Sequence, residues 1–564
     1  MAKTTDDDSK AAMPAPTKTR SRLEEVERES SGPAWMLTGS EAKLLGIAGV
    51  GFFLDAYDLF IINPVATMLQ YRLYGGKHLP ANLEGFVKAG ANIGSVIGQF
   101  GFGYAADALG RQKVYGKELM LIIFATIMTL TTPTGSLSPD HALIYLGVWR
   151  IILGIGVGGD YPMSASVTSD RANIRKRGTM LTYIFSMQGW GSFMGSLMTI
   201  IVLAIYRHAI EVEGKTSKVD GVWRIVVGLS LIPAFGTLYQ RLTLGESSRF
   251  EASQKIGDSE RSGPSHTSST SDEDEIYKLK ELQRKEEEGE GAGKDPAEVT
   301  ERRGGNGERE GEGEVEDVEP DVLVKKPAHF KDFYNHFKQW RNGKMLLGTC
   351  LCWFLLDIAF YGINLNQNVV LQQIGFDGKD GTEWNKLFKV STGNMIVTAL
   401  GFVPGYYATL FTIEILGRKT IQIMGFLMAA LFLGVLAGMF ETLSKAQFIV
   451  CFAFLQFFFN FGANTTSYCY PAEVFPTRYK AFAHGISAAC GKAGAILSAL
   501  AFNTLSKSIG TPNCLWIFFG CCVLGAFATL LLPEVKGRDP DAILAQQIAE
   551  ERAERMRRTG RSRE

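Results

Sequence analysis

The most regular feature of the chain is a series of long apolar segments separated by short polar loops. A helix that crosses the hydrocarbon core of a bilayer needs about 20 mostly apolar residues. The hydropathy pattern predicts twelve such helices, and hence an all-α membrane protein. They are expected at residues 43–64, 83–107, 116–133, 142–164, 178–205, 223–243, 345–367, 388–412, 420–440, 447–470, 481–504 and 513–533.

Lysine and arginine are unevenly distributed among the short loops. The loop after the second segment carries Arg111 and Lys113, the loop after the fourth carries Arg175 and Arg177, and the loop after the third carries neither residue type. Cytoplasmic loops of membrane proteins carry an excess of these cations. The even-numbered loops and both termini are therefore predicted to face the cytoplasm.

Charged residues crowd the two ends and one long central loop, which divides the helices six and six. Much of that loop is rich in Gly and Glu and cannot build a core, so about 250–325 is predicted to be disordered. Ser271 precedes four acidic residues, a pattern that fits either a phosphorylation site or a merely solvated charge run. The loop and tails are candidates for contacts with a kinase or a ubiquitin ligase. The predicted divisions are a tail at 1–42, a six-helix half at 43–245, the linker at 246–343, a second half at 344–535 and a tail at 536–564.

The two halves repeat each other. An acid-x-x-Gly-Arg motif follows the second segment and again the eighth, and a Tyr-Pro pair lies 54 residues past the first acid and 56 past the second. Two six-helix halves related by a repeat are the layout of transporters that rock around a central site. The residues concerned are Asp107, Gly110, Arg111 and Tyr161-Pro162 in the first half, and Glu414, Gly417, Arg418 and Tyr470-Pro471 in the second.

These motifs resemble signatures of the major facilitator superfamily. The resemblance covers about 40–540 and includes Glu246 with Arg249 and the stretch "PEVKGR" near the end of the second half. It implies that charged residues at the cytoplasmic helix ends act as gates, although a static ion pair is the alternative for each. The expected gate pairs are Asp107 with Arg111, Glu414 with Arg418, and Glu473 with Arg478.

Several ionisable residues lie inside the apolar segments, where their cost makes them functional candidates. Asp55 and Asp58 are spaced i, i+3 and share one helix face. Two close carboxylates in an apolar setting favour retention of a proton by at least one of them, which suits a proton carrier. Structural pairing with a basic group on another helix is the alternative.

Asp160, Arg150 and Lys492 are further ionisable residues within the segments. Arg150 lies ten residues before Asp160 on the same predicted helix, and the two are candidates for exchanging ion-pair partners during transport; for Arg150 a plain anchoring role is the alternative. Lys492 is surrounded by small residues in mid-segment. A buried ammonium without a partner loses its charge, so an anion or a carboxylate is expected beside it.

Trp353, Asp357 and Tyr361 are spaced i, i+4, i+8 and are predicted to form one polar stripe on the seventh helix. Gln188, Asn464 and Tyr468 add neutral polar groups in other segments. One cation, several carboxylates and many neutral donors suit a small oxyanion that carries protons. Monobasic phosphate can donate to Asp357, whereas sulfate cannot donate and would be repelled.

The stretches "GGDYPMSASVTSDRANIRKRG" and "PAEVFPTRYKAFAHGISAACGKAGA" resemble the fungal and plant phosphate:proton symporters. The resemblance implies a multi-pass protein of the plasma membrane that is driven by the proton gradient and uses no cofactor and no metal. It implies phosphate binding by Tyr161, Gln188, Trp353, Asp357, Tyr361 and Asn464. It implies proton coupling and gating by Asp55, Asp58, Arg150, Asp160 and Lys492.

The same sequence is compatible with other functions. A sugar, polyol or organophosphate carrier of the same fold, and a phosphate-sensing transceptor, remain alternatives. The equal numbers of basic and acidic residues indicate no nucleic-acid partner. An enzyme is not expected, because no Ser-His-Asp order, metal-ligand cluster or P-loop appears in the sequence.

The segment 154–165, "GIGVGGDYPMSA", contains the G-x-G-x-x-G pattern of a dinucleotide-binding loop. Such a loop must follow a strand and open a helix, whereas these glycines lie within a predicted membrane helix. We therefore expect them to let a neighbouring helix pack closely and to expose Asp160 and Tyr161 to a central cavity. Pro162 is expected to disrupt the helical hydrogen bonding just beyond.

Overall fold

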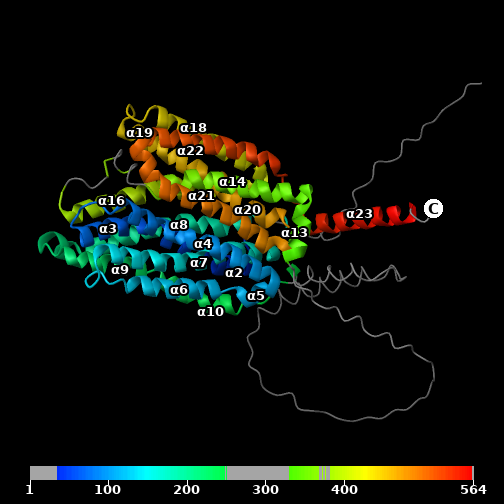
Figure 1. Cartoon of the computed structure of the whole chain (residues 1–564), viewed down its shortest axis with the longest axis horizontal. Coiled ribbons are helices and arrows are strands. Elements are labelled where there is room, and N and C mark those ends of the chain that lie inside the picture. Colours follow the sequence, from blue (N-terminus) through cyan, green and yellow to red (C-terminus); the bar gives the residue numbers. More distant parts are fainter. Residues whose placement is uncertain are drawn as a thin grey trace, which may run out of the picture. The chain divides into compact units, whose positions relative to one another are not determined.

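The computed structural model describes Pro33 and residues 35–247, 249–250, 330–366, 371, 375–376 and 381–561. The chain divides into one unit of Met1–Ser253 with Pro327–Glu564 and another of Gln254–Lys326. Most of the predicted linker, including Ser271, and most of the N-terminal tail lie outside the described residues. The regular elements of the described residues are all helical, as Figure 1 shows.

The first half contains the elements that lie before the linker. Its long helices are joined by short loops, and two predicted segments are each made of two consecutive helices. The elements are α2 (Gly39–Phe60), α3 (Ile62–Tyr74), α4 (Ala81–Leu109), α5 (Arg111–Val114), α6 (Lys117–Leu130), α7 (Pro139–Arg171), α8 (Arg177–Ile205), η1 (His208–Val212), η2 (Thr216–Lys218), α9 (Val219–Gly228) and α10 (Leu231–Leu242).

The second half follows the same plan and adds a short helix before it and a long one after it. The elements are α13 (Phe330–Lys338), α14 (Trp340–Asn364), α16 (Glu383–Val397), the π-turn η3 (Thr398–Phe402), α17 (Val403–Leu416), α18 (Arg418–Gly438), α19 (Lys445–Asn460), α20 (Ala463–Val474), η4 (Thr477–Tyr479), α21 (Lys480–Ile509), α22 (Thr511–Ala528), η5 (Thr529–Leu531) and α23 (Pro540–Arg561).

All twelve predicted segments are helical, which confirms the expected fold class. Within the described residues, ten helices are long and apolar enough to cross a membrane. The other two predicted segments are α4, which is rich in glycine and polar side chains, and α6, which has 14 residues. The predicted end of the fourth segment at residue 164 is wrong, because α7 continues through Pro162 to Arg171.

The glycine-rich segment 154–165 lies in the middle of α7, where α7 packs along α4. A Cβ atom on Gly154 would overlap the backbone of Ala91, and one on Gly158 would overlap that of Ser95. Only glycine permits this approach of the two backbones, as is common between membrane helices. The helix continues before and after these glycines, so the G-x-G-x-x-G pattern here serves helix packing.

The two halves meet along pairs of long helices. In Figure 1, α4 of the first half lies beside α21 of the second, and the two are in contact, as are α8 and α17. We call the end of the bundle that carries residues 107–111, 171–177 and 414–418 the inner end, and the opposite end the outer end. The central candidate residues lie between them, on helices from both halves.

Candidate functional site

A buried acid, lysine and tyrosine form the part of the central site that belongs to the second half. Trp353, Asp357 and Tyr361 are buried along α14, as the i, i+4, i+8 spacing predicts. Lys492 of α21 donates a hydrogen bond to the Tyr361 hydroxyl at 2.6 Å and lies 3.5 Å from the Asp357 carboxylate. The expected partner of the buried ammonium is therefore Asp357.

A chain of neutral hydrogen bonds crosses from one half to the other. Gln188 of α8 donates to the Tyr161 hydroxyl of α7 at 2.6 Å. The Tyr406 hydroxyl of α17 donates to the side-chain amide oxygen of Gln188 at 3.1 Å. The side-chain amide of Asn464 in α20 donates to the Tyr406 hydroxyl at 2.9 Å. Neutral donors that can rotate, such as these, can bind an oxyanion without adding charge.

Tyr406 was not predicted as a site residue. The sequence offers two adjacent tyrosines, Tyr406 and Tyr407, and gives no means of deciding which faces the centre. The π-turn η3 lies just before α17 and changes the helical register that a regular period would assign. In the structure Tyr406 is buried in the centre, whereas Tyr407 bonds with Trp190 near the surface.

Aromatic contacts join the two groups of residues. The Lys492 ammonium lies 5.2 Å from the ring centroid of Tyr161 and 4.2 Å from that of Tyr361. The Trp353 ring lies 6.2 Å from that of Tyr161. A lysine held over two aromatic rings gains cation–π attraction at each. The six predicted substrate-binding residues therefore form one cluster, which we call the central cluster: Tyr161, Gln188, Trp353, Asp357, Tyr361 and Asn464.

Asp160 lies next to the central cluster but in a different environment. Its carboxylate receives two hydrogen bonds from Arg241 of α10, at 2.9 and 3.2 Å, and Glu118 of α6 receives one from the same guanidinium at 3.2 Å. All three side chains are fully buried. The expectation that Asp160 is exposed to a central cavity is therefore wrong for this structure, because Arg241 holds it in the interior of the first half.

Sequence reasoning missed both Arg241 and Glu118. Each lies near the end of a predicted apolar segment, where a charged side chain ordinarily reaches the membrane surface. What places them inside is the packing of α6 and α10 against each other. Their only sequence signal is the general one, an acid or base within a few residues of a membrane segment.

Arg150 does not pair with Asp160 in this structure. Its guanidinium donates to the backbone carbonyls of Val87 at 3.0 Å and Asp58 at 3.1 Å. Ten residues along a helix span about 15 Å, too far for a direct contact. Arg150 thus anchors α7 to α4 and α2, which agrees with the alternative that the sequence left open.

Asp55 and Asp58 are both buried on α2. Among the described residues, neither oxygen of Asp55 has a hydrogen-bond partner, and one oxygen of Asp58 also lacks one. Asp55 interacts electrostatically with Asp160 and Arg241 of the first half and with Lys492 of the second. Asp55 therefore stands between the buried charges of the first half and the central cluster, whereas Asp58 lies near Arg150.

The gate motif of the first half contacts the second half directly. The Asp107 carboxylate accepts hydrogen bonds from the backbone N–H groups of Ala481 at 3.3 Å and Phe482 at 2.8 Å, which begin α21. Arg111 lies 3.8 Å from Asp107 and donates to the Thr477 carbonyl at 2.9 Å. Lys480 of the second half also pairs with Asp170 of the first at 2.8 Å, and Asp170 contacts Arg111.

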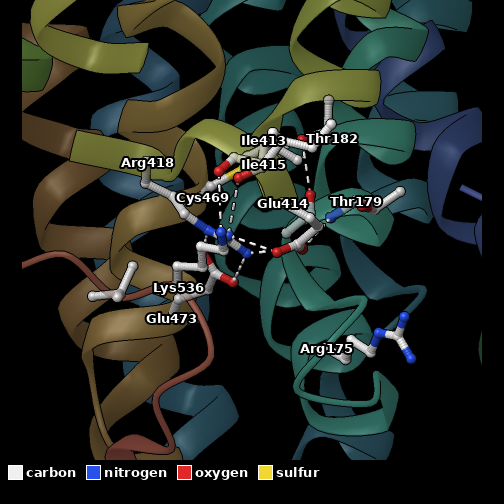
Figure 2. Close-up of polar contacts among 12 residues, drawn as sticks. Arg175, Thr179, Thr182, Ile413, Glu414, Ile415, Arg418, Cys469, Glu473 and Lys536 are labelled. Carbon is white, nitrogen blue, oxygen red and sulfur yellow. Dashed lines mark hydrogen bonds and ion pairs between the residues drawn. The ribbon is translucent and has the colours of Figure 1, made fainter. Parts of the chain in front are cut away.

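The gate motif of the second half is held mainly within its own half, as Figure 2 shows. Arg418 binds both oxygens of Glu414, at 2.7 and 2.9 Å, and both oxygens of Glu473, each at 2.7 Å. Glu414 also accepts one hydrogen bond from the backbone N–H of Thr179 in the first half, at 3.1 Å. Arg418 is completely buried between these acids.

The predicted pairing of Glu473 with Arg478 is wrong. Glu473 binds Arg418, and Arg478 lies 3.7 Å from Asp332 of α13 instead. The reason is a break in the helix between the two residues. α20 ends at Val474 and the chain continues through an extended Phe475 before the turn η4, so Glu473 and Arg478 do not share a helix face.

The acids that follow each half occupy equivalent places. Glu246 accepts from the backbone N–H of Gln112 at 3.1 Å, and Glu534 accepts from those of Arg418 at 3.0 Å and Lys419 at 2.9 Å. Each caps the helix that follows a motif glycine. Gly110 and Gly417 have φ of 97° and 83°, values that favour glycine. Arg249, expected to act with Glu246, interacts electrostatically with Arg177.

Comparison with known proteins agrees with this arrangement. The profile of the family described as "Sugar (and other) transporter" matches residues 44–304 and 336–544. The chain belongs to this transporter family. A putative inorganic phosphate transporter of Schizosaccharomyces pombe is 45% identical over 519 residues, which cover 90% of this chain and 88% of the relative. The inorganic phosphate transporter PHO84 of Saccharomyces cerevisiae is 36% identical, with 93% of this chain and 86% of the relative covered.

Solved structures support the fold. The proton:xylose symporter XylE, a major facilitator superfamily protein, superposes with a TM-score of 0.64 at 18% identity, covering 90% of this chain and 100% of XylE. A partially occluded inward-open form of XylE from E. coli gives a TM-score of 0.60 at 19% identity, covering 89% of this chain and 100% of XylE. This transporter therefore has the major facilitator fold.

Hydrogen bonds join the halves of this transporter at the outer end as well. Asn63 of α3 donates to the Asn364 carbonyl at 3.0 Å, and the Trp384 indole donates to the Leu203 carbonyl at 2.7 Å. Together with the bonds of Asp107 and Glu414 at the inner end, they bridge the interface on both sides of the central cluster. Release of a solute from the centre requires that one of these two sets be broken.

Proposed function

We propose that the protein takes up inorganic phosphate together with protons, by alternating access around the central cluster. Two kinds of observation support this function. The chain is 45% and 36% identical to proteins named as inorganic phosphate transporters, over most of its length. The central cluster also combines a carboxylate with several neutral donors, and the Lys492 ammonium lies beside it, which is the chemistry that a protonated oxyanion requires.

The observation that carries the proposal is the pairing of Asp357 with Lys492 beside donors from both halves. The ammonium balances the charge of the carboxylate at 3.5 Å and can share its positive charge with an entering anion. Monobasic phosphate donates from its hydroxyls to Asp357 and accepts from Tyr361, Tyr161 and Gln188. Because those last two residues belong to the other half, bound phosphate contacts both halves and can couple their movement.

Proton coupling is assigned to the buried carboxylates of the first half. Asp55, Glu118 and Asp160 surround a single cation, Arg241, so full ionisation leaves an excess of negative charge in the interior. Such an excess is costly, and protonation of one carboxylate reduces it. Asp55 is the member without hydrogen-bond partners among the described residues, and it interacts electrostatically with Lys492. Protonation of Asp55 from outside is thus proposed to precede phosphate binding.

Release then follows from the lower proton concentration of the cytosol. Loss of the proton restores the negative charge of Asp55 next to the phosphate site, and the repulsion favours departure of the anion through the inner end. We place the protein in the plasma membrane, as its resemblance to the phosphate:proton symporters implies. Both termini are placed in the cytoplasm, the side on which Lys- and Arg-rich loops ordinarily lie. No cofactor is needed for these steps.

The test is uptake of radiolabelled phosphate into vesicles that contain the purified protein. Imposing an alkaline interior is expected to raise the initial rate of the wild-type protein. Asp357→Asn removes a charge-assisted acceptor worth about 1.5–3 kcal/mol, which corresponds to roughly a 10–100-fold loss of uptake. Glu441→Gln is the matched control, because Glu441 is exposed outside the central cluster and should leave uptake unchanged.

Two results would contradict the proposal. Normal uptake by Asp357→Asn would remove the central cluster from the mechanism, and uptake that ignores the proton gradient would remove the coupling. If xylose, a polyol or an organophosphate ester instead inhibited phosphate uptake at concentrations as low as those at which phosphate analogues do, that result would indicate a carrier of another solute. Full signalling by a variant that transports nothing would favour a sensor.

A further inference from the structure

A polar cavity lies at the inner end of the second half, away from the central cluster. It has a volume of about 500 Å³ and lies between the first turn of α14, the end of α20, the segment after α22 and the first turns of α23. Four basic side chains line it, from three separate parts of the chain: Arg341, Lys344, Lys419 and Arg538. No step of the proposed transport uses this cavity.

The positive charge of this cavity is not balanced from within. Its one acidic lining residue is Glu473, and both of that residue's oxygens are bound by Arg418 at 2.7 Å. The Lys419 ammonium donates to the backbone carbonyl of Leu532 at 2.7 Å, which leaves its charge unpaired by an acid. The cavity therefore has an excess of cations over free carboxylates.

Among the described residues, the other lining cations have weak ionic partners or none. Arg341 lies 3.5 Å from Glu550, but more than half of each side chain is exposed, and such a pair contributes little. Within the described part of the chain, neither Lys344 nor Arg538 forms an ion pair. Several cations held together without acids repel one another unless an anion joins them.

The start of α14 adds to the positive potential. The helix begins at Trp340 without a side-chain cap, has no acid in its first turn, and places Arg341 and Lys344 near its N-terminus. A helix N-terminus carries partial positive charge and ordinarily favours acidic residues. Cations at this position are unfavourable by themselves and become favourable when an anion lies between them and the helix end.

We propose that this cavity binds a phosphate-bearing anion at a regulatory site distinct from the central cluster. Arg341, Lys344 and Arg538 supply charge-assisted hydrogen bonds, and Lys419, bound to the Leu532 carbonyl, adds its charge to the wall. Apolar residues such as Met345, Leu532 and Leu544 line the same cavity, so it also accepts an apolar body next to the anion. Two sources present this chemistry at the inner end: the headgroup of an anionic phospholipid and free cytosolic phosphate.

Binding is measured by the melting temperature of the purified protein in detergent, because a ligand of the folded state raises it in a saturable way. Three additives are titrated separately: phosphatidylinositol 4-phosphate with short acyl chains, phosphatidylcholine of the same chain length, and inorganic phosphate. The test protein carries Arg341→Ala, Lys344→Ala and Arg538→Ala. The control carries Lys113→Ala, Lys117→Ala and Lys331→Ala, three exposed lysines that do not line the cavity.

We expect the phosphoinositide to stabilise the wild-type and control proteins in a saturable way. If its half-saturating concentration is about tenfold or more higher in the test protein, the site binds a lipid headgroup. The same dependence on the three cations for inorganic phosphate assigns it to the soluble anion. Equal stabilisation of all three proteins, or equal stabilisation by phosphatidylcholine, overturns the proposal. If the test protein does not fold, Lys344→Ala alone is used. This readout requires no uptake, so it stands or falls independently of the transport mechanism.

Discussion

The two acid-x-x-Gly-Arg motifs have the same sequence pattern and different partners. Asp107 is 3.8 Å from its own arginine and accepts with both carboxylate oxygens from N–H groups in the first turn of α21, in the other half. Glu414 binds its own arginine at 2.7 and 2.9 Å and makes one bond, to Thr179, across the interface. The first motif thus connects the halves, and the second mainly stabilises its own.

The side-chain length of the acid explains part of this difference. Glutamate has one methylene more than aspartate, so Glu414 reaches back to Arg418, four residues on, in a bidentate pair. Asp107 is too short to do so and accepts from the N-terminus of α21, where the helix dipole favours a carboxylate. A connection of that kind can break when the halves move, whereas a buried bidentate pair is costly to separate.

Arg418→Ala is expected to have the largest effect. It leaves Glu414 and Glu473 buried without their cation, and removing one partner of a buried pair costs about 3–5 kcal/mol. Thermal unfolding of the purified protein, followed by tryptophan fluorescence, measures the loss of stability. Arg418→Lys keeps the charge without the bidentate geometry, so its stability should lie between that of the wild type and that of Arg418→Ala. If Arg418→Ala were as stable as the wild type, the conclusion that the second motif stabilises its own half would be wrong.

Asp107→Asn should have a smaller effect that appears at the interface. The N–H groups of Ala481 and Phe482 lose a charged acceptor worth about 1.5–3 kcal/mol, so their hydrogen exchange should accelerate by roughly 10–100-fold. Exchange of peptides from the first turn of α21 measures this directly. Asp140→Asn, at the outer end, is the control and should leave those peptides unchanged. Unaltered exchange in Asp107→Asn would show that the bond does not hold the inner end.

Glu414→Asp tests whether one methylene separates the two behaviours. The shorter side chain cannot keep both the bidentate pair with Arg418 and the bond to Thr179, so about 1 kcal/mol of stability should be lost. The melting temperature and the exchange of the first turn of α8 are measured together. Faster exchange with an unchanged melting temperature would mean that the shorter side chain retains the ion pair with Arg418 and loses the hydrogen bond from Thr179. A loss of stability without faster exchange would mean that the pair with Arg418 breaks before the bond to Thr179. That result would contradict the assignment of the buried pair as the stronger interaction.

Arg478→Ala should have the smallest effect. Its partner Asp332 is 3.7 Å away and partly exposed, and pairs of this kind contribute less than about 1 kcal/mol. The variant is compared with Arg418→Ala under the same unfolding conditions. A loss as large as that of Arg418→Ala would restore the pairing of Glu473 with Arg478 that the sequence had suggested.

The sequence by itself determined the order of the apolar helical segments, the repeat, and which polar residues lie within those segments. These properties depend on the local cost of placing a polar group in hydrocarbon, which can be evaluated residue by residue along the chain. Asp357, Lys492 and Gln188 were identified in this way, and the stripe of Trp353, Asp357 and Tyr361 followed from the helical period alone.

Only the tertiary structure decided which polar groups meet. Asp160 binds Arg241 of another helix, Glu473 binds Arg418, and Tyr406 enters the central network after a π-turn. Each of these contacts depends on how helices distant in sequence are rotated and shifted against one another. That rotation is set by the packing of whole helix faces, such as the glycine contact of α4 with α7, and the identity of a single charged residue does not reveal it.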